Sequence, residues 1–161
     1  MFGGSTRFKM HSNNAITKTI AHLKAGDIVA GHDNIPKVIS SIGKDRAKMY
    51  KIFQSNGYCY FVSKNHPLCL ARYKDGKYEF TEIPFIDYFS SKELRNEWYG
   101  YSVKASCTLK WRRGEPLIPG EVKVLKLSIL TYEELGNNIC YRIEFQSGDK
   151  FVIQGNTVCH C

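Results

Sequence analysis

The sequence MYKIFQSNGYCYFV at residues 49–62 returns, with small changes, as CYRIEFQSGDKFV at residues 140–152. Both copies contain Tyr, a basic residue and Ile, followed by Phe-Gln-Ser, a glycine-containing turn and Phe-Val. Aromatic and β-branched residues on both sides of such a turn are typical of a β-hairpin. Because short hairpins often contain these residue types, a chance similarity is the competing explanation. The shared Gln favours a duplication, since Gln is not among the residues enriched in strands.

The two copies continue into different residues. The first runs into Ser63-Lys-Asn-His66, and the second runs into Cys159-His160-Cys161. One half of a duplicated β unit therefore supplies a hydroxyl and an imidazole, while the other supplies two thiols and an imidazole. This pairing of reactive groups predicts a functional site.

The rest of the chain is also rich in strand and turn signals. Alternating apolar and polar residues predict strands at residues 7–11, 16–20, 28–30, 38–42 and 122–129. A helical turn is expected at residues 21–24, and a short helix at residues 91–97, where Ser91 is a suitable N-cap. We therefore expect an all-β fold of two duplicated, intertwined halves related by a pseudo-twofold axis, with one short helix between them.

Length and composition narrow the class of protein. The 161 residues, 43% hydrophobic and 24% charged, fit one globular domain spanning residues 1–161. No apolar run has membrane-spanning length, and the first residues do not form a signal peptide. The net charge of +8 favours acidic partners in general. Its densest basic cluster, KWRR at residues 110–113, is interpreted as a solvated loop rather than a nucleic-acid contact.

The six cysteines are interpreted as free thiols. A chain of this length does not need disulfides for stability and shows no secretory signal, so we expect a reducing, cytoplasmic compartment. Cysteines within apolar strands behave as small hydrophobic residues. Cys159 and Cys161 do not fit that description, because they flank His160 instead.

Five segments, in order along the chain, resemble the motifs of the Hint family, which includes inteins, hedgehog autoprocessing domains and bacterial intein-like domains. Residues 2–8 are similar to the first block, which normally begins with Cys, and residues 20–29 contain the Leu, Gly-Asp and Val of the next element. Ser63-Lys-Asn-His66 resembles the Thr-x-x-His motif. The last two blocks resemble residues 141–145 and 151–155. The resemblance implies a Hint-type horseshoe fold and a minimal intein or intein-like domain that processes its own peptide bonds.

The resemblance also implies a chemistry for these residues. A nucleophile at residue 1 attacks the preceding carbonyl and converts an amide into a thioester, a step that needs a proton donor for the departing nitrogen. His66 is then the expected donor, and Ser63 is expected to hold the peptide or its oxyanion. Because flanking segments are the substrates, we expect partners in cis (exteins), a monomer, no cofactor, and neither nucleic acid nor membrane.

The sequence departs from the family pattern at both ends. Met1 has no ionisable proton, and the terminal His-Asn is missing, so we expect the chain as written to be inactive. In one alignment Cys161 follows the scissile bond while Cys159 and His160 replace His-Asn. In the other, His160 is the penultimate histidine and Cys161 stands in place of Asn; we favour this one because it keeps His160 catalytic.

Arg142 occupies a position where the family often has Asp or Cys, and Arg cannot act as a base. Cys140 or Asp149 is the expected replacement. The candidate site is thus the set Met1, Ser63, His66, Asp149, Cys159, His160 and Cys161.

Two other functions fit parts of the sequence. Cys159, His160 and Cys161, together with His66 or Cys69, offer soft ligands for zinc, although a Cys-x-Cys pair is less usual than Cys-x-x-Cys. A basic β module could bind nucleic acid through residues 111–113 and exposed tyrosines. The second alternative leaves the repeat and both termini unexplained.

Overall fold

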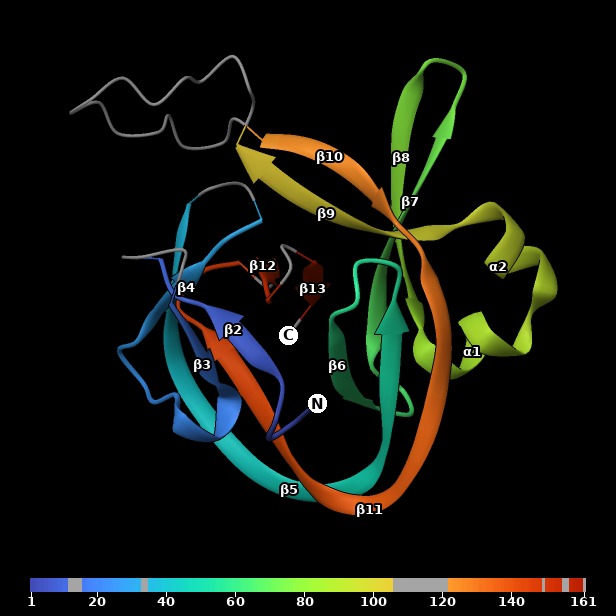
Figure 1. Ribbon diagram of the computed structural model, residues 1–161. Coiled ribbons are helices and arrows are strands. Elements are labelled where there is room, and N and C mark those ends of the chain that lie inside the picture. Colours follow the sequence, from blue (N-terminus) through green and yellow to red (C-terminus); the bar gives the residue numbers. More distant parts are fainter. Residues whose placement is uncertain (12–15, 33–34, 106–121, 149, 155–156, 161) are drawn as a thin grey trace.

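Two long strands that pair along almost their whole length form the frame of the molecule. The computed structural model describes residues 1–11, 16–32, 35–105, 122–148, 150–154 and 157–160. Strands β5 (Pro36–Gln54) and β11 (Ile129–Phe145) run antiparallel, from the pair Gln54–Ile129 to the pair Ile39–Phe145. Figure 1 shows this ribbon bent into a U, with both chain ends between its arms.

The strand that carries residue 1 is inserted into this frame. The sheet order is β11-β1-β6-β5-β4, so β1 (Phe2–Gly3) lies between β11 and β6 (Cys59–Ser63). Phe2 pairs with Tyr141 on one side and with Val62 on the other. Strand β4 (Ile28–Ala30) pairs with the start of β5. The backbone at the beginning of the chain is therefore held from both sides.

The remaining strands form a second sheet and two small ribbons. The second sheet has the order β10-β9-β7-β8, made of β7 (Pro67–Lys74), β8 (Lys77–Pro84), β9 (Tyr99–Ala105) and β10 (Val122–Leu127). The hairpin β7–β8 turns at Asp75-Gly76, where both residues have positive φ, as the two-residue turn that suits twisted strands requires. The small ribbons are β2 (Arg7–Lys9) with β3 (Thr17–Thr19), and β12 (Lys150–Val152) with β13 (Val158–His160).

The helical segments are short. A 3-10 turn covers Ile20–His22, close to the helical turn expected at residues 21–24. Helix α2 (Lys92–Glu97) is the expected short helix, and the Ser91 side chain accepts a hydrogen bond from the Leu94 backbone N–H at 3.3 Å. None of the helices in the described part of the chain has the length and apolar character to cross a bilayer.

The prediction of a single short helix is wrong, because α1 (Phe85–Ser90) precedes α2. Helix propensity alone did not predict this helix, because aromatic residues are not strong helix formers. Phe85 and Tyr88, one turn apart, are buried on the same side, so tertiary packing stabilises a helix that the local sequence does not favour.

The duplication is found in the ribbon but not in the strands that return from it. Tyr50 lies opposite Glu134 and Tyr141 lies opposite Lys44, so the two copies occupy equivalent places at opposite arms of the U. Their ends also match: the Ser55 N–H donates to the Ser128 carbonyl and the Gln146 N–H to the Val38 carbonyl, both at 2.9 Å.

The prediction of two matching hairpins is wrong. Strand β6 returns along β5, as expected, but β12 pairs with β13, and Phe151 also pairs with Gly31. With both edges of Phe151 occupied, β12 contacts the end of β11 through the Phe145 and Phe151 rings, whose centroids are 5.2 Å apart. The pseudo-twofold relation therefore describes the ribbon, while the second return strand instead carries the end of the chain into the centre.

An aromatic cluster joins the two ends of the chain in the core. Phe8 and Phe151 stack with ring centroids 4.8 Å apart, and Phe2 contacts each ring edge-on at 5.5 Å. All three side chains are fully buried. Burial of such rings provides about 1.5–3 kcal/mol each, so this cluster is a principal reason that both ends stay near the middle of the fold.

We predict that Gly3→Ala destabilises the protein. A Cβ at Gly3 would lie 2.6 Å from the Cβ of Phe61, which cannot move without moving β6. Overpacking of this kind costs about 1–3 kcal/mol, and each kcal/mol lowers Tm by roughly 2–4 °C in a domain of this size. Gly43→Ala is the matched control, since a Cβ there meets nothing within 4 Å. Equal Tm values for the two variants would contradict the tight insertion of β1.

Candidate functional site

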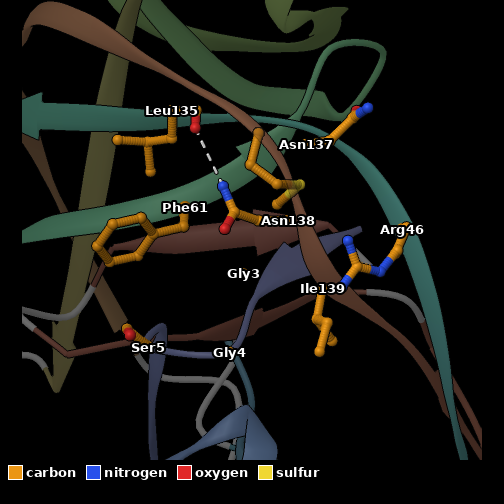
Figure 2. Close-up of a pocket in the computed structure, with 10 residues that line it drawn as sticks. Gly3, Gly4, Ser5, Arg46, Phe61, Leu135, Asn137, Asn138 and Ile139 are labelled. Carbon is orange, nitrogen blue, oxygen red and sulfur yellow. Dashed lines mark hydrogen bonds between the residues drawn. The ribbon is translucent and has the colours of Figure 1, made fainter.

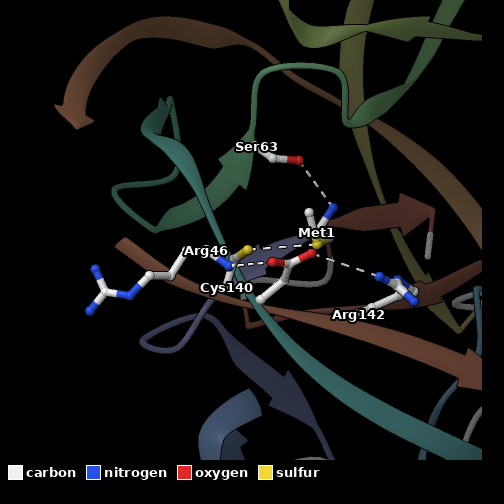
Figure 3. A network of polar contacts seen from close by, with 6 residues as sticks. Met1, Arg46, Ser63, Cys140 and Arg142 are labelled. Atoms are coloured by element: carbon white, nitrogen blue, oxygen red, sulfur yellow. Dashed lines mark hydrogen bonds and ion pairs between the residues drawn. The ribbon is translucent and has the colours of Figure 1, made fainter. Parts of the chain in front are cut away.

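The nitrogen of residue 1 lies against two polar side chains of the loop after β6. The Met1 amino group donates to Ser63 Oγ at 3.2 Å and lies 3.1 Å from His66 Nδ1. The Met1 carbonyl accepts a hydrogen bond from the Ser63 N–H at 3.0 Å. Ser63 thus fixes the backbone of residue 1 through its main chain and contacts the nitrogen through its side chain (Figure 3).

The loop that presents His66 is anchored on both sides. The His66 N–H donates to the Ser63 carbonyl at 3.1 Å and closes a tight turn. The start of α1 then holds the turn, because the Phe85 N–H donates to the His66 carbonyl at 2.8 Å and the Ile86 N–H to the Lys64 carbonyl at 3.2 Å. The unexpected helix α1 therefore has a role in positioning the imidazole.

The His66 ring is buried and neutral. Its side chain is 2% exposed and packs edge-on against Phe2 at 4.5 Å. Burial holds the pKa of His66 well below its ordinary value of 6.5, and the charges of the amino terminus and of His160 lower it further. Because the amino group is a donor, Nδ1 is the acceptor and the ring proton is on Nε2.

The other end of the chain approaches the same region along β13. His160 is close enough for its charge to act on His66, and its Nε2 lies 3.6 Å from a Glu82 carboxylate oxygen. Cys159, its neighbour in the strand, is buried in the core, where burial and nearby Cys69 raise the pKa of its thiol. The structure brings Met1, Ser63 and His66 into contact and His160 near them, whereas Cys159 faces the core. Asp149 and Cys161 lie outside the described residues.

Two buried polar residues that the sequence did not single out hold these ends in place. The Thr6 hydroxyl accepts from the Phe61 N–H at 3.1 Å and donates to the Phe61 carbonyl at 3.3 Å, which ties the turn after β1 to β6. The Thr157 hydroxyl donates to Gln54 Oε1 at 2.8 Å. Gln54 belongs to the repeated Phe-Gln-Ser, so this bond gives the first copy's Gln a structural role: it links the first hairpin to the end of the chain.

The side chain of residue 1 has its own neighbours on β11. The Cys140 thiol lies 3.6 Å from the Met1 sulfur, and Arg142 extends toward Asp45, 4.0 Å away (Figure 3). Burial raises the pKa of the Cys140 thiol, and the charge of the amino terminus opposes this effect. The sequence alone offers Cys140 as a replacement at the position of Arg142. The alternation of side chains along β11 puts Cys140 and Arg142 on one face, and the register of β1 against β11 then brings Cys140 to residue 1.

A cleft of about 620 Å³ opens beside β1. Figure 2 shows that the chain just after residue 1 forms one wall, Phe61 of β6 another, and the middle of the ribbon the rest. Asn138 on this wall donates to the Leu135 carbonyl at 3.1 Å. The lining residues are Gly3, Gly4, Ser5, Arg46, Met49, Phe61, Leu135, Asn137, Asn138 and Ile139.

No protein-family model matches the sequence, and no curated protein matches it. Solved structures match the fold over nearly the whole chain. The gp41-1 intein is 17% identical, with 99% of this chain and 97% of that chain covered and a TM-score of 0.59. The DnaB intein from Synechocystis sp. PCC 6803 is 12% identical, with 99% and 96% covered and a TM-score of 0.65. The Msm DnaB1 intein splicing domain, solved with zinc bound, is 12% identical, with 100% of both chains covered and a TM-score of 0.59.

The chain has the fold of an intein. The likeness extends to nearly the full length of the matched inteins, and it confirms the all-β, Hint-type architecture inferred from the motifs. Sequence identities of 12% to 17% establish the fold alone. Any activity must therefore be argued from the side chains of this chain.

Each of the two alternative functions depends in part on residues outside the described ranges. Among the described residues, no three His, Cys, Asp or Glu side chains are grouped in a way that could hold a metal ion. The zinc set of His66, Cys159, His160 and Cys161 depends on Cys161, which is not described. The basic residues 111–113 proposed for nucleic-acid contact also lie outside the described ranges.

The state of His66 predicts a pH dependence of stability. An unfolded histidine binds a proton below about pH 6.5, whereas folded His66 does not, so the unfolded state takes up more protons there. The free energy of unfolding should therefore fall as the pH drops below about 6.5, by up to about 1.4 kcal/mol per pH unit from this group. Denaturant unfolding of wild type and His66→Gln between pH 7.5 and 5 measures the slope. Identical slopes in both proteins would show that His66 is not buried as a neutral ring.

Proposed function

We propose that this chain is a self-processing domain that breaks, and in the complete reaction rejoins, peptide bonds at its own ends. Its substrates are then flanking protein segments in cis. The observation that supports this most directly is the contact of the residue 1 nitrogen with His66 Nδ1 at 3.1 Å and Ser63 Oγ at 3.2 Å inside a partly buried site. In a precursor that same nitrogen belongs to the peptide bond with the preceding segment.

The residues of the site fit the steps of an acyl shift. A thiol on residue 1 would attack the preceding carbonyl carbon, the new C–S bond would form, and the C–N bond would break. The departing nitrogen needs a proton, and His66 Nδ1, which lies within hydrogen-bond distance, can deliver it after taking up the proton that the attacking thiol loses. Ser63 can donate to the peptide oxygen or hold the nitrogen in place, and the partial burial of the site strengthens both interactions.

Burial of His66 has a consequence for this step. A histidine with a lowered pKa is a weak base at rest and, once protonated, a strong acid. It would therefore release its proton readily to the departing nitrogen. The low pKa is suited to a group that acts as an acid for a poor leaving group.

Residue 1 of this sequence lacks the thiol that the acyl shift requires. Met1 carries a thioether, which has no proton to lose and cannot accept an acyl group reversibly. We therefore propose that residue 1 itself cannot perform the acyl shift in this sequence. It also includes a monomer in a reducing, cytoplasmic compartment, because the reaction acts in cis and depends on free thiols.

Restoring the thiol should restore cleavage. A reporter protein fused ahead of residue 1 in the Met1→Cys variant should be released by added dithiothreitol, because the thioester is open to thiol exchange. Adding His66→Ala should slow release by roughly 10²–10⁴-fold, the usual cost of losing a positioned proton donor. Release is measured on gels and by intact mass. His22→Ala, a change at an exposed histidine, is the matched control and should leave the rate unchanged; equal rates for the two alanine variants would remove His66 from the mechanism.

The C-terminal junction should behave differently. Asn can cyclise onto its own carbonyl and release a following segment, whereas His and Cys cannot. A fusion with a reporter after residue 161 should therefore release it slowly, and Cys161→Asn should raise the rate, with His160→Ala lowering it again. Mass spectrometry of the released reporter measures this. Efficient release by the unchanged sequence would show that the terminal Cys-His-Cys uses a different chemistry.

A further inference from the structure

A carboxylate of the second sheet reaches the end of the chain. Glu82 on β8 lies opposite Cys69 on β7, and residues that are directly opposite in an antiparallel pair share one face of the sheet. Cys69 on that face is buried in a cluster with Val152 of β12 and Val158 of β13. The small ribbon β12–β13 therefore packs on the face that carries Glu82.

The Glu82 carboxylate contacts both members of one residue pair in this ribbon. Lys150 and His160 are direct partners in the β12–β13 pairing. One oxygen of Glu82 lies 3.6 Å from Lys150 Nζ, and the other lies 3.6 Å from His160 Nε2. The three side chains are partly buried, with exposed fractions from 21% for His160 to 35% for Glu82. Charges interact more strongly in such surroundings than in bulk water.

The segment that carries Glu82 also supports His66. Strand β8 ends at Pro84 and α1 begins at Phe85, whose N–H donates to the His66 carbonyl at 2.8 Å. Residues 82–86 thus contact both histidines of the proposed reaction, His160 through a carboxylate and the loop of His66 through the backbone. A strand that continues directly into a helix therefore holds both rings.

We propose that Glu82 is the positioning residue for His160 at the C-terminal junction. This inference rests on the proposed self-processing function and names the residue that orients its second histidine. The carboxylate accepts a hydrogen bond from Nε2–H of the neutral ring, which fixes the tautomer and leaves the lone pair on Nδ1. The 3.6 Å contact is longer than a hydrogen bond and should shorten when a peptide occupies the junction, as catalytic hydrogen bonds often do.

Lys150 makes a carboxylate necessary at position 82. Its ammonium group can only donate, so it takes one Glu82 oxygen and leaves the other to His160. An amide at position 82 has a single oxygen, which Lys150 would take, and the amide NH₂ would then face the imidazole. The ring would have to accept at Nε2 and carry its proton on Nδ1. Glu82→Gln should therefore invert the tautomer of His160, whereas Glu82→Asp should keep it.

The test is the ring tautomer of His160 in the full chain labelled with nitrogen-15. Long-range proton–nitrogen correlation spectra at about pH 8.5, two units above the ordinary histidine pKa, distinguish the two neutral forms, and His160→Gln identifies the signals of residue 160. We expect the proton on Nε2 in wild type and in Glu82→Asp, and on Nδ1 in Glu82→Gln. Glu93→Gln, at an exposed carboxylate of α2, is the matched control and should give the wild-type pattern.

The same variants should change release at the C-terminal junction of the Cys161→Asn fusion. There the side-chain amide nitrogen attacks the carbonyl carbon of residue 161, the C–N bond to the reporter breaks, and the reporter nitrogen gains the proton that the amide loses. Glu82→Gln should slow release by up to about 10²-fold, the cost of misplacing a catalytic group by about 1 Å. Glu82→Asp should restore most of the rate, and Glu93→Gln should leave it unchanged.

Two results would overturn the inference. A proton on Nε2 of His160 in Glu82→Gln would show that Glu82 does not fix the ring. Equal release rates for Glu82→Gln and Glu93→Gln would show that the orientation of the ring does not matter to the reaction. If the tautomer depends on Glu82 but no Cys161→Asn fusion releases the reporter, Glu82 still orients His160, and the proposed function fails at this junction instead.

Discussion

The antiparallel pairing of β5 with β11 is the constraint on which the other features of this protein depend. In the sequence, β11 begins 75 residues after the end of β5. The pairing of these two strands brings the two halves of the chain together. The register of the ribbon shifts near residues 130, 135 and 40, and an extra residue on one strand kinks such a pair. At the shift near residue 135, Gly136 has a φ of +75°, a conformation that costs glycine little. The bend creates a space between the arms that both chain ends occupy.

Within that space, the position of residue 1 is set by its backbone. Strand β1 is only two residues long, but it pairs on both edges, and the Met1 carbonyl is bonded to Ser63. Both edges matter for the site, since β6 continues into the loop that carries His66 while β11 carries Cys140. A nitrogen, an imidazole and a thiol that are far apart in sequence thus become neighbours through strand pairing and through the loop that α1 holds. The buried rings of Phe2, Phe8 and Phe151 keep the C-terminal strand close to the same point.

Features encoded by local pattern could be predicted from the sequence. The strands, the Ser91 cap and the Ser-x-x-His loop each depend on residues within a few positions of one another, and the repeat indicated the long ribbon. The departures depend on packing between distant segments. Helix α1 forms because Phe85 and Tyr88 reach the core, and β12 leaves the expected hairpin because Phe151 pairs with Cys159 and Gly31. Likewise, the contact of Cys140 with residue 1 depends on the register of β1 against β11, which no local pattern specifies.

The central claim is that strand pairing holds the nitrogen of residue 1 in contact with the His66 ring, and that the C-terminal segment lies beside both. Nuclear Overhauser effects between aromatic protons in isotopically labelled protein test this claim most directly. The structure predicts cross-peaks from the Phe2 ring to both His66 and Phe151, whose ring centroids lie 4.5 and 5.5 Å away. A Phe2 ring with cross-peaks to neither residue would contradict the account, because residue 1 would then lie away from the imidazole that the proposed reaction requires.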